Sequence, residues 1–149
     1  MNTLRTLPLA VTLLSALCSP LTHAACTDPV DPSGVQLQAQ TQNGITYLSG
    51  GIGMDEACAL QRMPGYTLRM TFSEGVGNEY VPVSAISIQN AQAHEILNVN
   101  DVGPMMLVKL PAGHYVVVAQ HEGREVRSAV DLTTGKPYTL NLHWKDAGQ

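Results

Sequence analysis

Hydrophobic and polar residues alternate along most of the chain after residue 65. In 66–73 every even position is apolar and every odd position is polar or charged. Alternation of this kind indicates a β-strand with one buried face. Comparable patterns, separated by Gly- and Pro-containing turns, predict further strands at 84–88, 96–99, 105–110, 115–119, 125–132 and 138–144. Short strands spaced in this way are typical of an antiparallel β-sandwich, here of about seven strands.

One predicted strand, 115–119, is apolar on both faces. Tyr115, Val117 and Ala119 share one face, and Val116 and Val118 share the other. A strand of this kind is usually central in its sheet or covered on both sides.

The segment before residue 65 is less regular. Residues 25–44 contain Asp-Pro pairs and predict an irregular lead-in, and Asn43-Gly44 favours a hairpin turn within 35–48. Residues 54–63 predict the one short helix. Asp55 and Glu56 suit its N-terminal end, and Arg62 suits its C-terminal end.

The first 24 residues have the three zones of a secretory signal peptide. Arg5 supplies a positive charge, 7–17 is an apolar run too short to span a bilayer, and Ala24 ends a small-residue cleavage site. Cleavage is expected after Ala24, with Ala25 as the alternative. His23 stands three positions before Cys26, where a lipoprotein signal has an aliphatic residue, so we expect soluble export to the bacterial periplasm without a membrane span.

Composition supports a single folded domain without nucleic-acid affinity. Removing 24 of the 149 residues leaves 125, with seven basic residues against 12 acidic ones. An acidic chain without a basic run is a poor partner for a phosphate backbone. Hydrophobic residues make up 44% and charged residues 13%, which favours a packed core over disorder.

Two of the three cysteines stay in the mature chain. Cys18 leaves with the signal peptide, whereas Cys26 and Cys58 remain. An even pair in an oxidising compartment predicts one disulfide, the alternative being two separate buried thiols.

The segment 103–119 carries a family resemblance. Its sequence, GPMMLVKLPAGHYVVVA, followed by Gly123, resembles the carboxypeptidase regulatory-like domain, in which a strand ends in Leu-Pro-x-Gly and the next rises as Tyr-x-Val-x-Ala. The matching corner residues are Leu110, Pro111, Gly113 and Tyr115. The segments 47–53 and 138–144 resemble a bacterial exported subset of these proteins.

The resemblance covers about residues 45–145. It implies an all-β, seven-stranded transthyretin-like or Ig-like sandwich over residues 45–146, with one short N-terminal helix. It does not imply peptidase activity, because in carboxypeptidases this domain accompanies a separate zinc-containing catalytic domain.

Candidate chemistry is sparse. His94, His114, His121 and His143 lack metal-ligand spacing, and the odd separation of His114 and His121 predicts opposite faces of a strand. Scattered surface histidines are therefore favoured, although a cluster could assemble in the fold. The methionines at 54, 63, 70, 105 and 106 show no copper-binding array and are expected in the core. No phosphate loop or Gly-x-Ser-x-Gly motif occurs.

These observations favour a non-catalytic periplasmic module that contacts a protein, a glycan or another envelope component. No cofactor or metal is expected. The alternative is a small hydrolase or metal-dependent protein that uses His114, His121, His143 and nearby acids. The C-terminal residues lack the Tyr-Arg-Gly-Ser motif of hydroxyisourate hydrolase, an enzyme with transthyretin architecture.

Overall fold

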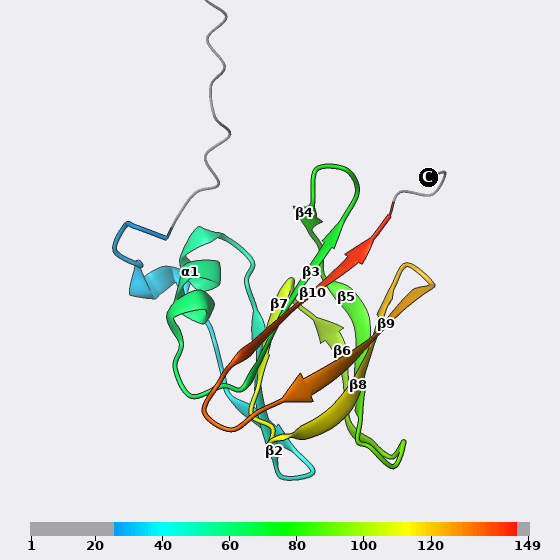
Figure 1. Ribbon diagram of the computed structural model, residues 1–149. Helices are drawn as coiled ribbons and strands as arrows, with labels where there is room; N and C mark the ends of the chain where they lie inside the picture. Colours follow the sequence, from blue (N-terminus) through cyan, green and yellow to red (C-terminus); the bar gives the residue numbers. More distant parts are fainter. Residues whose placement is uncertain (1–25, 146–149) are drawn as a thin grey trace, which may run out of the picture.

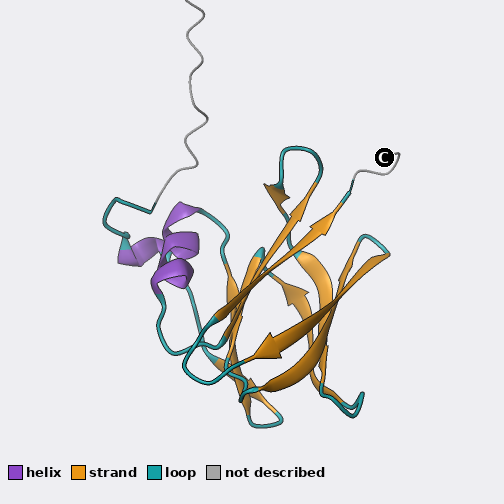
Figure 2. Ribbon diagram, in the orientation of Figure 1, coloured by secondary structure: helices purple, strands orange, loops and turns teal. Residues whose placement is uncertain are grey.

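The computed structural model describes residues 26–145, which form two β-sheets and one α-helix (Figures 1 and 2). The predicted signal peptide and its cleavage site at Ala24 lie outside the described residues. The elements, in chain order, are the 3-10 turn η1 (Pro32–Gly34), β1 (Gln40–Gln42), β2 (Ile45–Gly50), α1 (Met54–Arg62), β3 (Leu68–Glu74), β4 (Glu79–Tyr80), β5 (Val83–Gln89), β6 (Glu95–Val102), β7 (Met105–Val108), β8 (Gly113–His121), β9 (Arg124–Leu132) and β10 (Tyr138–Trp144).

The strands form a larger and a smaller sheet. The larger has the order β1-β2-β7-β3-β10, with β4 paired to β3, and the smaller has the order β6-β5-β8-β9. The strand β8 thus lies between two neighbours, as its two apolar faces predict. Within residues 26–145 there are ten strands rather than the seven expected, partly because the short β1 and β4 add to the larger sheet. The strand β1 also falls within the predicted lead-in.

One strand pair departs from the antiparallel prediction. The strands β3 and β10 are parallel, with Leu68 opposite Tyr138 and Glu74 opposite Trp144, and Figure 1 shows them running side by side in the same direction. Parallel neighbours cannot be joined by a tight turn and need a longer crossover. Here the crossover includes β4 and β7 of the larger sheet and all four strands of the smaller sheet.

The hairpin predicted around Asn43-Gly44 is confirmed. Strand β1 pairs antiparallel with β2, with Gln42 opposite Ile45. Asn43 and Gly44 both have positive φ, 51° and 79°, as the two central residues of a type I′ turn require.

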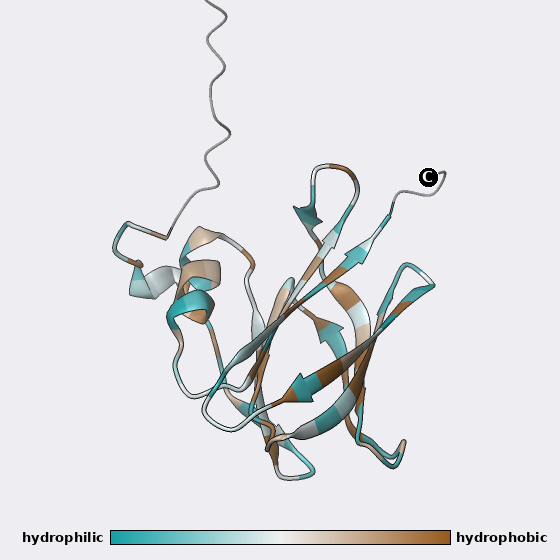
Figure 3. Ribbon diagram, viewed as in Figure 1, coloured by the Kyte–Doolittle hydropathy of each residue, from teal (hydrophilic) through white to brown (hydrophobic). Residues whose placement is uncertain are grey.

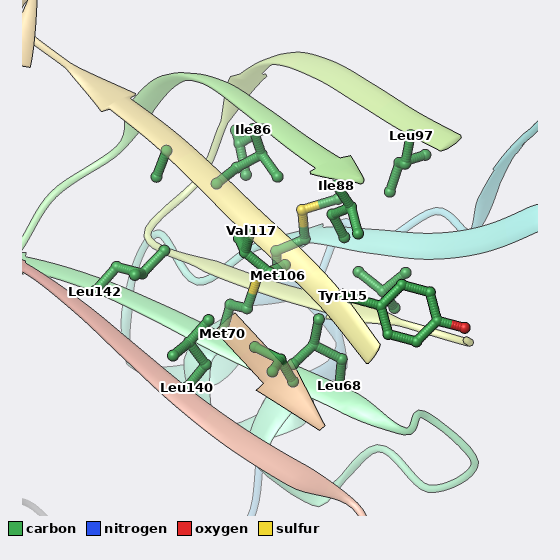
Figure 4. Close-up of a cluster of buried hydrophobic side chains, with 14 of the residues drawn as sticks. Leu68, Met70, Ile86, Ile88, Leu97, Met106, Tyr115, Val117, Leu140 and Leu142 are labelled. Carbon is green, nitrogen blue, oxygen red and sulfur yellow. The ribbon is translucent and has the colours of Figure 1, made fainter. Parts of the chain in front are cut away.

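The main core lies between the two sheets. Figure 4 shows side chains of the larger sheet, such as Met70 and Leu142, meeting side chains of the smaller sheet, such as Ile86 and Val117. Figure 3 shows hydrophobic and hydrophilic residues interspersed along the strands. The inward residues of β3 are Leu68, Met70 and Phe72, all fully buried, so the alternation is confirmed for 68–72. It is wrong at its two ends, because Tyr66 packs against the outer face of the sheet and Ser73 is buried.

A second apolar cluster lies between α1 and the outer face of the larger sheet. Its buried members are Leu48, Leu60, Tyr66, Met105 and Leu107. The strand β7 is consequently buried on both faces, by the main core and by this cluster.

Three of the five methionines expected in the core are buried there, namely Met70, Met105 and Met106. Met63 is partly buried, and the expectation is wrong for Met54, which is exposed. Met54 is the first residue of α1, where the helix end projects beyond the second apolar cluster.

The predicted disulfide is present and fastens the lead-in to α1. The sulfur atoms of Cys26 and Cys58 are 2.07 Å apart, and the bond joins residues separated by 32 positions. Next to it, the Arg62 guanidinium donates to the carbonyl oxygens of Cys26 and Asp28. The lead-in is therefore attached to the helix by both a covalent bond and hydrogen bonds.

Side chains bond backbone groups near both ends of α1, although the N-cap residue Gly53 makes no side-chain capping bond. The Glu56 carboxylate accepts the backbone N–H groups of Gly51 and Ile52 at 3.2 and 3.1 Å. At the C-terminal end it is Arg69 of β3, rather than Arg62, that donates to the Leu60 carbonyl at 3.1 Å. Acidic groups near the first turn and cations near the last one stabilise a helix.

The corner formed by Leu110, Pro111, Gly113 and Tyr115 lies at the start of β8. Leu110 and Tyr115 are buried, and the Tyr115 hydroxyl donates to the Pro111 carbonyl at 2.9 Å. A Cβ at Gly113 would stand 3.3 Å from that hydroxyl oxygen. Glycine at this position therefore avoids a tight contact with the Tyr115 ring. Burial raises the pKa of Tyr115.

Within residues 26–145, no helix combines the length and the apolar character that crossing a membrane requires.

Candidate functional site

A large surface groove lies beside α1, over the outer face of β3 and β10. Its volume is about 830 Å³. One wall is the helix, the floor is the strand pair, and the other wall is the turn between β3 and β4. The side chains that line it include Met54, Ala57 and Gln61 of the helix, Thr71, Ser73, Asn141 and His143 of the floor, and Asn78 and Tyr80 of the far wall.

The floor of the groove follows from strand alternation and register. Because Met70 and Phe72 point into the core, their neighbours Thr71 and Ser73 point outward. The parallel register sets Thr71 opposite Asn141 and Ser73 opposite His143. The Thr71 hydroxyl donates to the Asn141 side-chain carbonyl, and the Ser73 Oγ lies 3.1 Å from Nδ1 of His143.

The groove mixes polar and apolar side chains and carries no permanent charge. None of the described residues that line it is Asp, Glu, Lys or Arg, and the lining includes one histidine, His143. Hydroxyl and amide groups offer both donors and acceptors. The Tyr80 ring is 56% exposed at the rim and adds an apolar face with a polar tip. Such a surface suits a neutral ligand that carries many hydroxyl groups.

Ser73 and His143 also have the chemistry of a nucleophile and its general base, the first two members of a catalytic triad. A complete triad needs a third group that orients the imidazole. No carboxylate in residues 26–145 hydrogen-bonds His143, and Ser73 is itself buried. The equivalent Thr71–Asn141 contact two residues earlier indicates that such cross-strand pairs belong to the β3–β10 ladder.

The structure does not bring the four candidate histidines together. His94 is exposed in the turn between β5 and β6, and His114 is exposed and pairs with Asp131. His143 lies in the groove, whereas His121 is buried at the far end of β8. His114 and His121 do point to opposite faces of β8, as predicted from their spacing.

The expectation of surface histidines is confirmed for His94 and His114 and is wrong for His121, which is only 8% exposed. The sequence pattern did indicate this burial. His121 has an odd position on β8, as do Tyr115, Val117 and Ala119, which all face the core.

The acids whose pKa is lowered lie away from the groove. A backbone hydrogen bond from Ser33, followed by one from its hydroxyl, lowers the pKa of Asp31. Hydrogen bonds from the Ser87 hydroxyl and the Asn98 amide lower the pKa of Glu95. These carboxylates accept local hydrogen bonds and mark no second site.

Apart from His143, the groove residues were not predicted as a site, because strand partners such as Thr71 and Asn141 are 70 positions apart. Only the parallel pairing of their strands places them side by side.

Comparison with known proteins gives no further assignment: no family model matches the chain, and no curated protein matches it significantly.

Proposed function

We propose that the mature chain is a non-catalytic binding module of the periplasm and that its groove binds a glycan. The observation that carries this proposal is the uncharged, hydroxyl- and amide-rich lining of the groove beside the exposed Tyr80. Of the partner classes expected, a protein or another envelope component is often selected by complementary charge, which the described lining of the groove does not offer.

The chemistry of a sugar ring fits this lining. Its hydroxyl groups can both donate to and accept from Asn141, Thr71 and Gln61, which are exposed or half-buried. Its C–H face can lie on the Tyr80 ring, which has an apolar body. A few placed polar groups then fix the orientation of the ligand while the apolar contact contributes affinity.

The proposed compartment rests on the N-terminal sequence and on the disulfide. The charged, apolar and small-residue zones of the first 24 residues have the order of a signal peptide. Disulfides persist in oxidising compartments such as the periplasm, and the Cys26–Cys58 bond agrees with that location.

We further propose that the two-sheet fold is of the transthyretin-like, carboxypeptidase regulatory-like type. Its support is the corner at Leu110, Pro111 and Gly113, followed by a buried Tyr115 at the start of the central strand β8. In such a fold the chain would supply a binding surface without a peptidase centre.

Substitution of Tyr80 by alanine is expected to weaken glycan binding about fivefold or more, because truncating an aromatic anchor of a binding site costs about 1 kcal/mol or more. The measurement is a screen of the purified protein against soluble oligosaccharides, followed by calorimetry on the best ligand. Tyr138→Ala is the matched control, since Tyr138 is also exposed but does not line the groove. Equal losses in both variants, or no oligosaccharide bound by the wild type, would refute the glycan site.

A small hydrolase is the second candidate, and the Ser73–His143 contact is the observation that favours it. Wild-type protein would then turn over ester or glycoside substrates, and Ser73→Ala would abolish turnover while leaving ligand binding intact. A binding module predicts no turnover by either protein.

Export predicts a shortened mature protein. Intact-mass spectrometry of periplasmic material should show loss of the first 24 residues, or 25 if cleavage follows Ala25. A full-length, membrane-bound species would contradict the proposed location.

A further inference from the structure

A second polar cluster lies where β3 and β8 end, apart from the groove. It consists of Glu74, the last residue of β3, His121, the last residue of β8, and Glu122 in the turn that follows. One ligand atom from each of these residues lies within 4.8 Å of the others. We refer to these three residues as the Glu-His-Glu cluster.

The orientation of His121 is fixed by its surroundings. Its Nδ1 lies 2.9 Å from the Pro82 carbonyl oxygen, and a carbonyl can only accept, so Nδ1 carries the proton. The ring also packs against Trp144, with centroids 5.4 Å apart. In the neutral ring, Nε2 therefore presents a lone pair toward Glu74.

That nitrogen makes no hydrogen bond, and its contact with Glu74 is an ion pair only if the ring is protonated. His121 Nε2 is buried, and Oε2 of Glu74 lies only 3.3 Å away. A lone pair that faces a carboxylate oxygen is unfavourable unless a positive species lies between them. Buried polar atoms without a partner are rare in folded proteins, and a bound ion is one of the recognised explanations for them.

We propose that the Glu-His-Glu cluster binds one divalent transition-metal ion of the Zn²⁺ class, through Nε2 of His121 and the carboxylates of Glu74 and Glu122. A mixed nitrogen and oxygen ligand set suits such ions. The 3.3 Å between Nε2 and Oε2 of Glu74 matches the spacing of about 3.3 Å between ligand atoms of a tetrahedral zinc site with bonds of about 2.0–2.1 Å.

The rest of the site has the features that a metal centre requires. The Pro82 carbonyl orients the imidazole from behind, as partners of metal-bound histidines do. Glu122 is an exposed turn residue, so its carboxylate can move inward. A cavity of about 530 Å³, lined partly by Glu74, Glu79 and Glu122, leaves a coordination position accessible from solvent.

Arg124 is the competing cation. Its Nη2 lies 3.0 Å from Oε2 of Glu74 and 3.8 Å from Oε2 of Glu122, and its Nη1 donates to the Lys145 carbonyl. The guanidinium offsets one of the three carboxylates that line the cavity. The remaining excess of negative charge still favours a divalent cation.

The test is a calorimetric titration of untagged, disulfide-bonded mature protein with Zn²⁺. The expected result is one bound ion per chain, and an affinity lowered at least about tenfold by Glu122→Gln, since even partners outside the ligand set change metal affinity 10–100-fold. Glu122 is exposed, so this variant keeps the fold. His114→Gln is the matched control, because His114 lies on the same strand but at the opposite, exposed end.

A second readout follows the ring itself. In ¹⁵N spectra, Zn²⁺ should shift the Nε2 resonance of His121 and leave Nδ1 protonated. The proposal is overturned if the wild type binds no Zn²⁺, if Glu122→Gln binds as tightly as the wild type, or if Nε2 of His121 carries a proton that Zn²⁺ does not displace. None of these outcomes bears on the groove, whose test uses oligosaccharides.

Discussion

Replacement of Tyr115 by alanine is expected to lower the free energy of unfolding by about 3–5 kcal/mol, the usual cost of truncating a buried aromatic side chain. The ring fills the end of the main core beside Ile88 and Leu68 (Figure 4). Its hydroxyl also satisfies the Pro111 carbonyl. Truncation would therefore leave both a cavity and an unpaired acceptor. Urea unfolding followed by circular dichroism measures the loss.

Two further variants separate the contributions at this corner. Tyr115→Phe keeps the ring and should lose only about 0.5–1.5 kcal/mol, the net value of one hydrogen bond. His114→Ala should cost less than about 1 kcal/mol, since its pairing with Asp131 is exposed to solvent. A large loss at His114 together with a small one at Tyr115 would mean that the assigned faces of β8 are reversed.

Alkaline pH offers an independent check. Burial raises the pKa of Tyr115, so the folded state holds this proton more tightly than the unfolded state does. The associated stabilisation is present below the unfolded pKa and is lost as the pH rises through the folded pKa. Tyr115→Phe, which has no proton to lose there, should show a shallower alkaline decline.

Loss of the disulfide should have an effect of similar size. The double variant Cys26→Ser, Cys58→Ser is expected to unfold with a free energy about 3–4 kcal/mol lower, because the bond closes a long loop and restricts the unfolded chain. The loop spans 32 positions. Chemical denaturation of oxidised, reduced and double-variant protein measures the difference.

The reduced wild type should behave like the double variant, which controls for the serine side chains themselves. Mass spectrometry without reductant should find the oxidised protein two protons lighter than the reduced one. Free thiols at both positions in periplasmic material, or equal stabilities before and after reduction, would contradict the prediction.

Sequence patterns predicted the elements of this fold well where one face is buried. Residues 138–144 were predicted as a strand and form β10 with the same bounds, because alternation alone determines which side chains are buried. The helix over 54–63 was likewise found, ending one residue earlier, since Pro64 and Gly65 stop it.

The pairing of strands was harder to predict from the sequence, because it depends on two distant segments at once. Nothing within 68–74 or 138–144 indicates that they are neighbours, or that they run parallel. The groove depends on that pairing, and so could not be predicted. The alternation along β8 did indicate that His121 is buried. The contact of His121 with Glu74, 47 positions earlier, appears only in three dimensions.

The β3–β10 pair also bears on how quickly the chain can fold. One edge of β3 stays open until a segment 70 positions downstream reaches it, and ladders of such high contact order form slowly. Until then, the backbone amides and carbonyls along that edge can pair with another chain as readily as with β10. Aggregation during refolding should therefore begin at β3, and it should grow steeply with protein concentration.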